Sequence, residues 1–434
     1  MNLQESLAYL SSLSRFGSVL SLERIQMLCA RYGHPEDRIP ALHVGGTKGK
    51  GSVTMMLSHI LRAAGMRVGS FVKPHLYDVR ERVLVDLEPI SGAEFTALMT
   101  EIRPHIEAVA AAGFGNPTEF EAKTLLMFLH FERLPVDVAV IEVGLGGTYD
   151  STNVLTPLVS VITNVSLDHV ERLGYTIPEI AAQKAGIIKP GRPVVTAARH
   201  PEALAVIERA AQAQGAPIWR IGREFDVTRE AFGEGWQRFR VRTPVREYRD
   251  LTTPMAGEFQ VENAATAVAA LDMLSAVERA VPEAAVRAGL AKARVMGRME
   301  ILRRAPLVMI DAAHNAASAQ ALAAALRELY GDRRLILVLG ISQDHSAADV
   351  VGALALRAAA VIATAADNPR ALPAEQVAAA ARQQAACVEA VTPVPEAVRR
   401  ALAIAQPEDL ICITGSFYVI GEVDPATLAH PPAG

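Results

Sequence analysis

The sequence predicts an α/β protein with two domains, each built around a mainly parallel β-sheet. Its 434 residues, half of them hydrophobic, exceed what one compact core usually holds. Short β-branched runs alternate with segments of helical spacing, which is typical of parallel sheets covered by helices on both faces. This alternation starts again after Arg298. We therefore expect a first domain over residues 1–297 and a smaller second domain over residues 298–434.

The first cycle of strands and helices is predicted from its apolar runs. The run ALHV, residues 41–44, predicts a buried strand that leads into a glycine-rich loop. The following segment, residues 52–65, has helical spacing and ends at a glycine, as helices commonly do. Further buried strands are expected at 67–72, 137–144, 158–165 and 192–198. Strands this apolar, separated by helices, indicate a parallel sheet.

Residues 218–253 depart from this pattern. They are rich in aromatic and charged side chains, which predicts a small antiparallel excursion. Helical segments return at 261–277 and 282–295. The second cycle then alternates alanine-rich helices with apolar strands, expected at 306–313, 333–341, 360–366, 387–393 and 409–416. We expect this part to form a doubly wound, Rossmann-like α/β unit of ordinary domain size.

The glycine-rich stretch HVGGTKGKGSV, residues 43–53, indicates a phosphate-binding loop. In a P-loop the backbone N–H groups hold phosphates, a lysine reaches the terminal phosphates and a hydroxyl binds Mg²⁺. Gly49 and Lys50 supply the core of that pattern, whereas Val44 replaces its first glycine and Gly51 its hydroxyl residue. The alternative is a glycine-rich turn with solvated lysines. The preceding strand and the following helix favour the phosphate site, so we expect a P-loop-type ATPase domain.

Several polar residues follow buried strands, at the edge where ligands bind in open α/β sheets. Glu142 ends one apolar run, and carboxylates are rarely buried without a partner. His169 follows the next strand, and Asp311 and His314 repeat the arrangement in the second half. Each can also be interpreted as an ordinary capping or core residue. Lys184 carries no such signal, and by itself it is interpreted as a solvated helix lysine.

The composition of the chain argues against several classes of function. The net charge is −4 with both signs mixed along the chain, which argues against a nucleic-acid-binding surface. Cys29, Cys387 and Cys412 match no metal or disulfide spacing, which indicates a reducing compartment. No segment has the features of a signal peptide or of a membrane span. We expect a soluble cytoplasmic protein without nucleic-acid or membrane partners.

Taken together, the motifs resemble one family. GTKGKGS at 46–52 is followed in order by PHLYDVRERV, TEFEA, IEVGLGG, LDHVERLG, QKAGIIKPG, GRME and DAAHN. This order and spacing are similar to those of the folylpolyglutamate synthase/dihydrofolate synthase family, which belongs to the Mur ligase superfamily. The resemblance covers nearly the whole chain, from SRFGSVLSLERI to GSFYVIGEV.

The resemblance implies ATP-dependent ligation of L-glutamate to a folate-type carboxylate, within folate biosynthesis and one-carbon metabolism. ATP would convert the carboxylate, a poor electrophile, into an acyl phosphate, and the α-amine of glutamate would then displace phosphate. Such catalysis consists mostly of positioning and of charge neutralisation by Mg²⁺, lysine and backbone dipoles. The implied cofactors are ATP and Mg²⁺. The implied partners are small molecules, and the expected oligomeric state is a monomer.

The resemblance also assigns roles to individual residues. The catalytic residues would be Lys50, Glu142, His169 and Lys184, the last matching a lysine that is carbamylated in this superfamily. Mg²⁺ would be held by Ser52, Glu142, His169 and the carbamylated Lys184. The nucleotide would contact Gly46, Thr47, Lys48, Gly49, Lys50, Gly51, Ser52, Asn263, Arg298, Asp311 and His314. The pterin-containing substrate would contact Thr118, Glu119, Phe120, Glu121 and Tyr149.

The chain departs from the usual family pattern within several of these motifs. Lys48 stands where an asparagine is usual, and Lys73 stands where many members have a serine that touches Mg²⁺. A glutamine replaces the glutamate before Lys184, and Phe259 replaces a histidine. GGTYDSTN at 146–153 stands where GGRLDATN is usual, and TEFE stands where TFFE is common. The last two differences lie at the expected substrate pocket, so the preferred folate stays open.

Two alternatives to this function stay open. Mur-type cell-wall amino-acid ligases normally carry an additional N-terminal domain, whereas here the glycine loop begins by residue 45, which argues against that function. A catalytically degenerate ATP-binding paralogue is favoured by the departures at Lys73, Gln183 and Tyr149. The argument against it is the joint presence of the expected site residues Lys50, Glu142, His169, Lys184 and Asp311. The sequence does not distinguish a dihydrofolate synthase from a folylpolyglutamate synthase, or from an enzyme with both activities.

Overall fold

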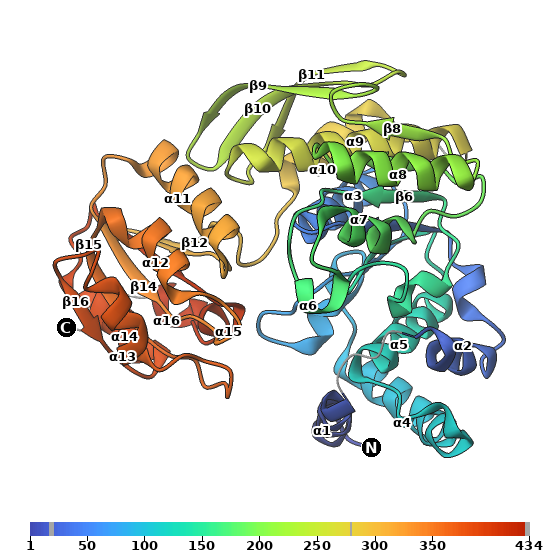
Figure 1. The fold of residues 1–434 in the computed structure, drawn as a ribbon, viewed down its shortest axis with the longest axis horizontal. Helices are drawn as coiled ribbons and strands as arrows, with labels where there is room; N and C mark the ends of the chain where they lie inside the picture. The colour runs from blue at the N-terminus through green and yellow to red at the C-terminus, as the bar shows by residue number, and fades with distance from the viewer. Residues whose placement is uncertain (17–20, 278–279, 430–434) are drawn as a thin grey trace.

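The protein is described by a computed structural model that covers residues 1–16, 21–277 and 280–429 (Figure 1). Two separate sheets, each covered by helices on both faces, form its N-terminal and C-terminal parts. The α/β class with a parallel N-terminal sheet and a smaller C-terminal α/β domain is therefore confirmed.

The first sheet has eight strands in the order β4-β3-β2-β5-β1-β6-β7-β8 within the described residues. Its strands are β1 (Ala41–Gly45), β2 (Val68–Phe71), β3 (Val83–Val85), β4 (Glu88–Pro89), β5 (Val138–Glu142), β6 (Val159–Ile162), β7 (Val194–Thr196) and β8 (Ile218–Arg220). The run from β2 to β8 is parallel, and only β3 and β4 pair antiparallel at one edge. All five strands expected in this half are present. The antiparallel edge strands β3 and β4 were not predicted.

Alternating side chains place two different helical layers on this sheet. Leu42 and Val44 of β1 face a core shared with α3, α9 and α10, whereas Ala41 faces a core shared with α4 and α5. The helices of this part are α1 (Leu3–Ser12), α2 (Glu23–Ala30), α3 (Lys50–Ala63), α4 (Gly92–Val109), α5 (Glu119–Arg133), α6 (Val170–Leu173), α7 (Ile177–Ala185), α8 (Pro201–Ala213), α9 (Glu258–Val277) and α10 (Glu283–Lys292). Because β1 lies between β5 and β6, the loop after β1 sits at the centre of the sheet edge.

The expected antiparallel excursion is present but begins later than predicted. It consists of β9 (Asp226–Gly233), β10 (Trp236–Arg242) and β11 (Glu247–Thr253), which form a three-stranded antiparallel sheet. The prediction was wrong for residues 218–220, because β8 pairs parallel with β7 and completes the first sheet. In Figure 1 this small sheet lies over α9 and extends toward the C-terminal domain.

The second sheet has the order β12-β13-β17-β14-β15-β16 within the described residues. Its strands are β12 (Glu300–Arg304), β13 (Leu307–Ile310), β14 (Leu335–Leu339), β15 (Ala358–Ala363), β16 (Val388–Ala390) and β17 (Leu410–Thr414). Its helices are α11 (Ala316–Tyr330), α12 (Ala347–Leu354), α13 (Ala374–Ala381), α14 (Val394–Ile404), α15 (Phe417–Gly421) and α16 (Pro425–Ala429). The five expected strands are all present. The antiparallel edge strand β12 was not predicted.

Candidate active site

A cleft of about 1250 Å³ lies between the two parts of the molecule, at the edge where β1, β5 and β6 end. This is the edge at which open α/β sheets bind ligands. The lining includes every residue that the sequence suggested as catalytic, nucleotide-contacting or substrate-contacting: Gly46, Thr47, Lys48, Gly49, Lys50, Gly51, Ser52, Thr118, Glu119, Phe120, Glu121, Glu142, Tyr149, His169, Lys184, Asn263, Arg298, Asp311 and His314. The fold thus brings all of them together, and their individual roles stay predictions.

The glycine loop turns sharply between β1 and α3 and leaves little room for side chains. Gly49 precedes the first residue of α3 with φ +82°, a left-handed conformation that favours glycine. A Cβ at Gly49 would lie 2.4 Å from Asn263 Oδ1, and one at Gly46 would lie 1.9 Å from Thr163 Oγ1. The loop is therefore packed closely against α9 and against the segment after β6.

Hydrogen bonds from the segment after β6 hold the loop in place. The Thr47 and Lys48 N–H groups donate to the carbonyl and side-chain oxygens of Asn164, both at 2.9 Å. Thr163 Oγ1 donates to the Lys48 carbonyl at 2.6 Å. The Lys48 ammonium pairs with Asp168 at 2.9 Å. These contacts fix the backbone from which α3 starts, so its N-terminal N–H groups can face an anion in the cleft.

Lys50, the first residue of α3, folds its side chain back over the loop. Its ammonium donates to the Gly46 carbonyl at 3.0 Å and to the Thr47 carbonyl at 3.2 Å. Burial lowers the pKa of Lys50 to about 8, although the nearby Glu142 carboxylate opposes this shift. The ammonium therefore lies against the loop in which a phosphate would bind.

Glu142 closes β5 directly beside this loop. Its carboxylate is 4% exposed and accepts a hydrogen bond of 3.0 Å from the Lys73 backbone N–H. Burial raises the pKa of Glu142, while the ammonium groups of Lys50 and Lys73 counteract that effect. A Cβ at Gly51 would lie 3.4 Å from Glu142 Oε2, so the glycine keeps the space beside the carboxylate open.

His169 and Lys184 line the cleft from α6 and α7. His169 precedes α6 in a left-handed conformation with φ +49°, and burial lowers the pKa of its imidazole. Lys184 is 3% exposed, and no described residue forms a hydrogen bond or ion pair with its ammonium. Burial, followed by repulsion from Lys50, lowers the pKa of Lys184 to about 7. The solvated-lysine interpretation is therefore wrong for this residue, because α7 buries it in the cleft wall.

The start of α5 forms another part of the cleft wall. Thr118 caps this helix, and its N–H and hydroxyl both donate to Glu121 at 2.7 and 2.8 Å. The Glu121 carboxylate also pairs with Arg24 at 3.1 Å, so its oxygens are already engaged. The Phe120 ring packs on Gly144, where a Cβ would lie 2.4 Å from the ring. Phe120 and the half-exposed Tyr149 give this wall an aromatic surface.

A group of buried cations in the same wall was not predicted. Lys123 pairs with Glu119 at 2.6 Å, and burial lowers the pKa of Lys123 to about 8. Arg82 donates from Nε to His75 Nδ1 at 2.9 Å. A signal was available for Lys123, because it interrupts the otherwise buried face of α5, EFEAKTLLMF.

The C-terminal domain contributes an acid, a histidine and an arginine. Asp311 accepts the N–H groups of Met299 and Ala313 at 2.9 and 2.8 Å, and burial raises the pKa of Asp311 although Arg298 opposes the shift. His314 Nδ1 lies 2.8 Å from the Ala312 carbonyl, and burial lowers the pKa of His314 to about 4. The imidazole is thus neutral at pH 7, with Nδ1 donating to that carbonyl.

Arg298 stacks over an aromatic ring at the mouth of the cleft. Its guanidinium carbon lies 5.0 Å from the centre of the Phe417 ring, within the range of a cation–π contact. On the opposite side, Asn263 of α9 donates to Gln260 at 2.9 Å and packs on Gly49. Arg298 and Asn263 therefore face the cleft from different domains.

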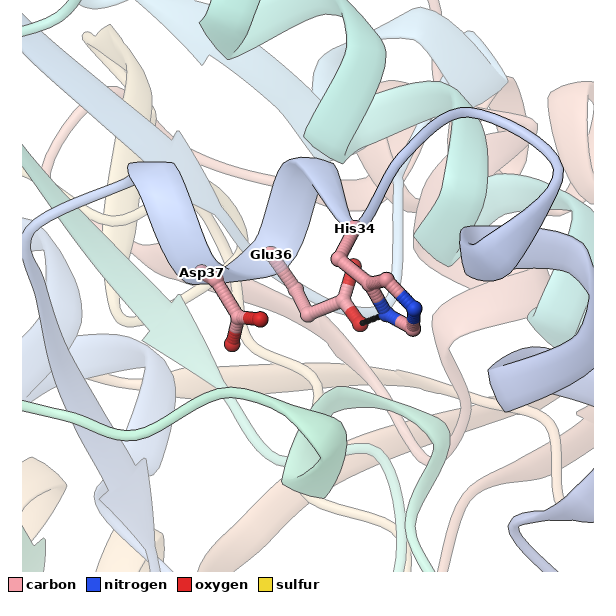
Figure 2. A group of neighbouring side chains, drawn as sticks. All are labelled: His34, Glu36 and Asp37. Carbon is pink, nitrogen blue, oxygen red and sulfur yellow. Dashed lines mark hydrogen bonds and ion pairs between the residues drawn. The ribbon is translucent and has the colours of Figure 1, made fainter.

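A second group of possible metal ligands lies outside the cleft, before β1. One atom from each of His34, Glu36 and Asp37 falls within 4.8 Å of the others. Figure 2 shows the Glu36 carboxylate facing the His34 ring, to which it is joined at 3.0 Å. His34 and Asp37 are exposed. The direct contact between imidazole and carboxylate accounts for this arrangement without an ion.

Among the described residues, no helix is both long and apolar enough to cross a membrane.

The fold and the cleft together define a class of protein. A glycine loop with a lysine folded over it, a buried carboxylate at the sheet edge and a second α/β domain facing both are the parts of a two-domain nucleotide-dependent ligase of the Mur type. Residues 44–271 match the Mur ligase middle domain, and residues 297–417 match the Mur ligase glutamate ligase domain.

Individual relatives narrow this class to one family. The dihydrofolate synthase/folylpolyglutamate synthase of Bacillus subtilis is 38% identical over 85% of this chain and 86% of its own length. The Mycobacterium tuberculosis folylpolyglutamate synthase complexed with ADP and AMPPCP has a TM-score of 0.90 at 33% identity, covering 99% of this chain and 100% of that one. The Escherichia coli FolC in complex with DHPP and ADP has a TM-score of 0.87 at 31% identity, covering 98% of each chain. This chain therefore belongs to the folylpolyglutamate synthase/dihydrofolate synthase family.

Proposed function

We propose that this protein is an ATP-dependent ligase that joins L-glutamate to a folate-type carboxylate. The observation that carries the proposal is the meeting of a glycine loop with its lysine, a buried carboxylate and an aromatic wall in one cleft between two domains. ATP, an aromatic acid and an amino acid can be held there side by side. Family membership supports the same reaction.

The reaction proceeds in two displacements. A carboxylate oxygen of the folate attacks the γ-phosphorus of ATP, ADP leaves, and an acyl phosphate forms. The α-amine of glutamate then attacks the acyl carbon, the bond from that carbon to the phosphate oxygen breaks, and the amine loses a proton as phosphate leaves. Neither step needs a protein nucleophile. The protein has to align the groups and neutralise charge.

We assign the nucleotide to the glycine loop and the facing domain. The N-terminal N–H groups of α3 and the Lys50 ammonium would hold the terminal phosphates. Three further residues complete the set: Asn263 packs on Gly49, and Arg298 and Asp311 approach from the other domain. His314 would be a neighbour of the nucleotide. Closure of the domains over ATP would bring these groups together and exclude water.

We further propose that Mg²⁺ accompanies the nucleotide at the edge of the glycine loop. Ser52 and Glu142 fit this role, because both are buried oxygen donors and Gly51 leaves the space beside the carboxylate open. His169 and Lys184 would hold ions farther along the cleft. Mg²⁺ supplies neutralisation of the negative charge on the transferred phosphoryl group.

Lys184 would serve there as a carbamate. The neutral amine adds to CO₂, a nitrogen–carbon bond forms, and a proton leaves the nitrogen, so a cation becomes an anion that can ligate a metal. The depressed pKa supports this reaction, because about half of an amine with a pKa of about 7 is neutral at pH 7. No described residue forms a hydrogen bond with the nitrogen, so its lone pair is not engaged elsewhere in that part of the chain.

We assign the pterin-containing substrate to the wall made by the start of α5 and by Tyr149. Phe120 and Tyr149 offer aromatic faces for a flat heterocycle. The Thr118 hydroxyl and the Glu119 carboxylate are the polar groups beside them. Glu121 would act mainly by holding this turn, since Thr118 and Arg24 already occupy its oxygens.

We propose a domain boundary at residue 297/298, a monomeric state and a cytoplasmic location. α10 ends at Lys292 and β12 begins at Glu300, so the boundary falls in the connection between the sheets. Cys29, Cys387 and Cys412 are all unpaired, as is usual in a reducing compartment. Sedimentation of the purified chain measures the oligomeric state directly.

The deciding experiment is ADP release by the purified protein with ATP, Mg²⁺ and L-glutamate. One reaction contains dihydropteroate and the other a reduced folate monoglutamate. Turnover with both identifies a bifunctional enzyme, and turnover with one identifies its substrate. Nucleotide binding without glutamate-dependent ADP in either reaction would contradict the proposal and support a degenerate ATP-binding paralogue. A UDP-sugar–peptide acceptor in a third reaction tests the Mur-type cell-wall alternative.

A further inference from the structure

Lys73 lines the cleft, whereas the side chain of a solvated lysine would extend away from the protein. It follows β2, and its backbone N–H donates to Glu142 Oε2 at 3.0 Å. Its side chain is partly buried and lines the cleft together with Lys50 and Lys184. The backbone contact ties the position of this lysine to the carboxylate expected to face the phosphates of ATP.

The charges around Lys73 act on its protonation in opposite directions. Burial lowers the pKa of Lys73, and Glu142 and then Asp150 are the carboxylates that most strongly oppose this shift. Its positive charge in turn lowers the pKa of Lys50, His169 and Lys184. Lys73 therefore interacts electrostatically with the groups around the expected phosphoryl-transfer site, and its side chain lines the same cleft.

We propose that the Lys73 ammonium is a further catalytic group, which contacts the phosphate oxygens of ATP and takes over part of the charge neutralisation that Mg²⁺ otherwise provides. This inference rests on the proposed ATP site. It assigns to this chain a lysine, which the phosphates would keep charged, where many members of its family have a neutral hydroxyl.

The carboxylates around Lys73 are mostly engaged by other groups, which supports the binding of an anionic ligand by this lysine. Asp150 accepts hydrogen bonds from the Leu145 N–H at 2.7 Å and from Thr152 Oγ1 at 2.5 Å, so this carboxylate is already engaged. Asp168 is paired with Lys48. Glu142 alone would have to neutralise both Lys50 and Lys73, which line the same cleft. A triphosphate would supply the missing negative charge, and a lysine ammonium is well suited to bind it as a compact point charge.

A second difference from the family pattern is consistent with this role. The usual GGRLDATN places an arginine where this chain has Thr148, whose hydroxyl donates to the Gln183 carbonyl at 3.1 Å. The cation is thus missing from the loop after β5 and present in the loop after β2. β2 and β5 are neighbouring parallel strands, so both loops leave the same edge of the sheet. One positive charge at this edge is retained.

The test is the affinity of the full-length protein for AMPPCP, measured by calorimetry with Mg²⁺ or with EDTA. Lys73→Ser should weaken metal-free binding by about 10- to 100-fold, the usual effect of removing one charge-assisted contact. The loss should be smaller with Mg²⁺, because the new hydroxyl can ligate the ion. Mn²⁺ should accordingly bind the AMPPCP complex of Lys73→Ser more tightly than the wild-type complex.

Matched variants make the outcomes decisive. Lys73→Arg should keep metal-free binding, and Lys73→Met should lose it without the gain in Mn²⁺ affinity. Lys292→Ser, at an exposed lysine of α10, should behave like the wild type. Equal losses with and without metal, or unchanged metal-free affinity in Lys73→Ser, would overturn the inference. Since neither folate nor glutamate is present, a wild-type protein that fails to bind AMPPCP with Mg²⁺ would instead refute the proposed ATP site.

Discussion

At the residue scale, the buried lysines of the cleft differ because their surroundings differ. The Lys50 ammonium donates hydrogen bonds to two loop carbonyls, whereas Lys184 has no such acceptor among the described residues. Burial is the main cause of the lowered pKa in both. Glu142 favours the charged form of Lys50, which suits phosphate binding. Lys184 is closer to neutral at pH 7, which suits reaction with CO₂.

Lys50→Ala should lower glutamate-dependent ADP release by at least about 100-fold, because it removes a charge from the phosphate site. Steady-state kinetics at saturating ATP measures the loss. The exposed Lys292→Ala provides the control and should keep full activity. Thermal unfolding of both variants separates a catalytic effect from a folding defect. Full activity in Lys50→Ala would contradict the phosphate assignment, and full activity in Glu142→Ala would contradict the Mg²⁺ assignment.

Carbamylation of Lys184 should increase with pH. A lysine with a pKa of about 7 loses its proton as the pH rises through that value, and only the neutral amine reacts with CO₂. In ¹³C-bicarbonate the protein should therefore show a carbamate carbon resonance that grows from about pH 6 to about pH 8, well below the usual lysine pKa of about 10.4. The resonance should vanish in Lys184→Ala and remain in Lys292→Ala. A spectrum without this resonance throughout the range would refute the carbamate.

Individual site residues differed in how far the sequence could reveal them. Glu142 ends one apolar strand of the first sheet and His169 follows the next, so the parallel topology was enough to bring them to one edge. Asp311 follows an apolar strand of the second sheet, and it meets them only because the two domains face each other across the cleft. Lys184 lies inside a helix and gave no local signal, because its burial depends on how α7 packs. The contact between Glu142 and the Lys73 backbone joins segments 69 residues apart, which no local pattern contains.

At the element scale, the position of α3 depends on close packing against α10. A Cβ at Gly289 of α10 would lie 2.4 Å from the Ile60 Cα of α3, so the helices meet with backbone against backbone. α3 starts at Lys50, directly after the glycine loop. The packing of α10 therefore helps to determine where the N-terminus of α3 points.

Gly289→Ala should destabilise the protein by about 1–3 kcal/mol, because the added methyl overpacks a contact with backbone atoms that cannot move aside. Helix propensity alone would make the alanine variant more stable than the glycine protein by about 1 kcal/mol. A loss of stability would therefore indicate the close contact between the helices. Gly352→Ala is the matched control. This helical glycine of α12 has open space around its Cβ position, and its substitution should be neutral or stabilising. Denaturant unfolding measures both variants, and equal stabilisation would refute the close contact.

The elements themselves were largely predictable from apolar runs, and the exceptions have a common cause. β3, β4 and β12 pair antiparallel at the ends of their sheets. β4 is exposed, β12 is mostly partly buried, and β3 is apolar but only three residues long. Such strands lack the longer apolar run that identifies β1 or β14. β8 was assigned to the antiparallel excursion because its aromatic and charged residues resemble that sheet. Its pairing with β7 is a tertiary contact that composition does not contain.

At the scale of the whole molecule, the small antiparallel sheet links the two domains as well as covering α9. Arg229 of β9 pairs with Glu328 of α11, and Glu234, in the turn after β9, pairs with Arg304 of β12 at 3.1 Å. Figure 1 shows this sheet extending toward the orange helix α11. The cleft lies between the same two domains, so these ion pairs act on the arrangement that forms the proposed active site.

The double variant Glu234→Gln/Glu328→Gln should therefore uncouple the domains without unfolding either one. Each partly exposed ion pair contributes only about 0–1 kcal/mol. Losing both pairs should therefore change the free energy of unfolding of the whole protein little. It should shift the equilibrium between domain arrangements strongly, because these arrangements differ little in free energy. In calorimetry at low salt, the smaller C-terminal domain should unfold a few degrees earlier while the main transition stays in place. Added salt should produce the same change in the wild type, because it screens both pairs.

Glu375→Gln removes a pairing with Arg382 inside the C-terminal domain and should not separate the transitions. Superimposable thermograms for the double variant and the wild type would show that packing at the connection, and not this sheet, holds the domains together.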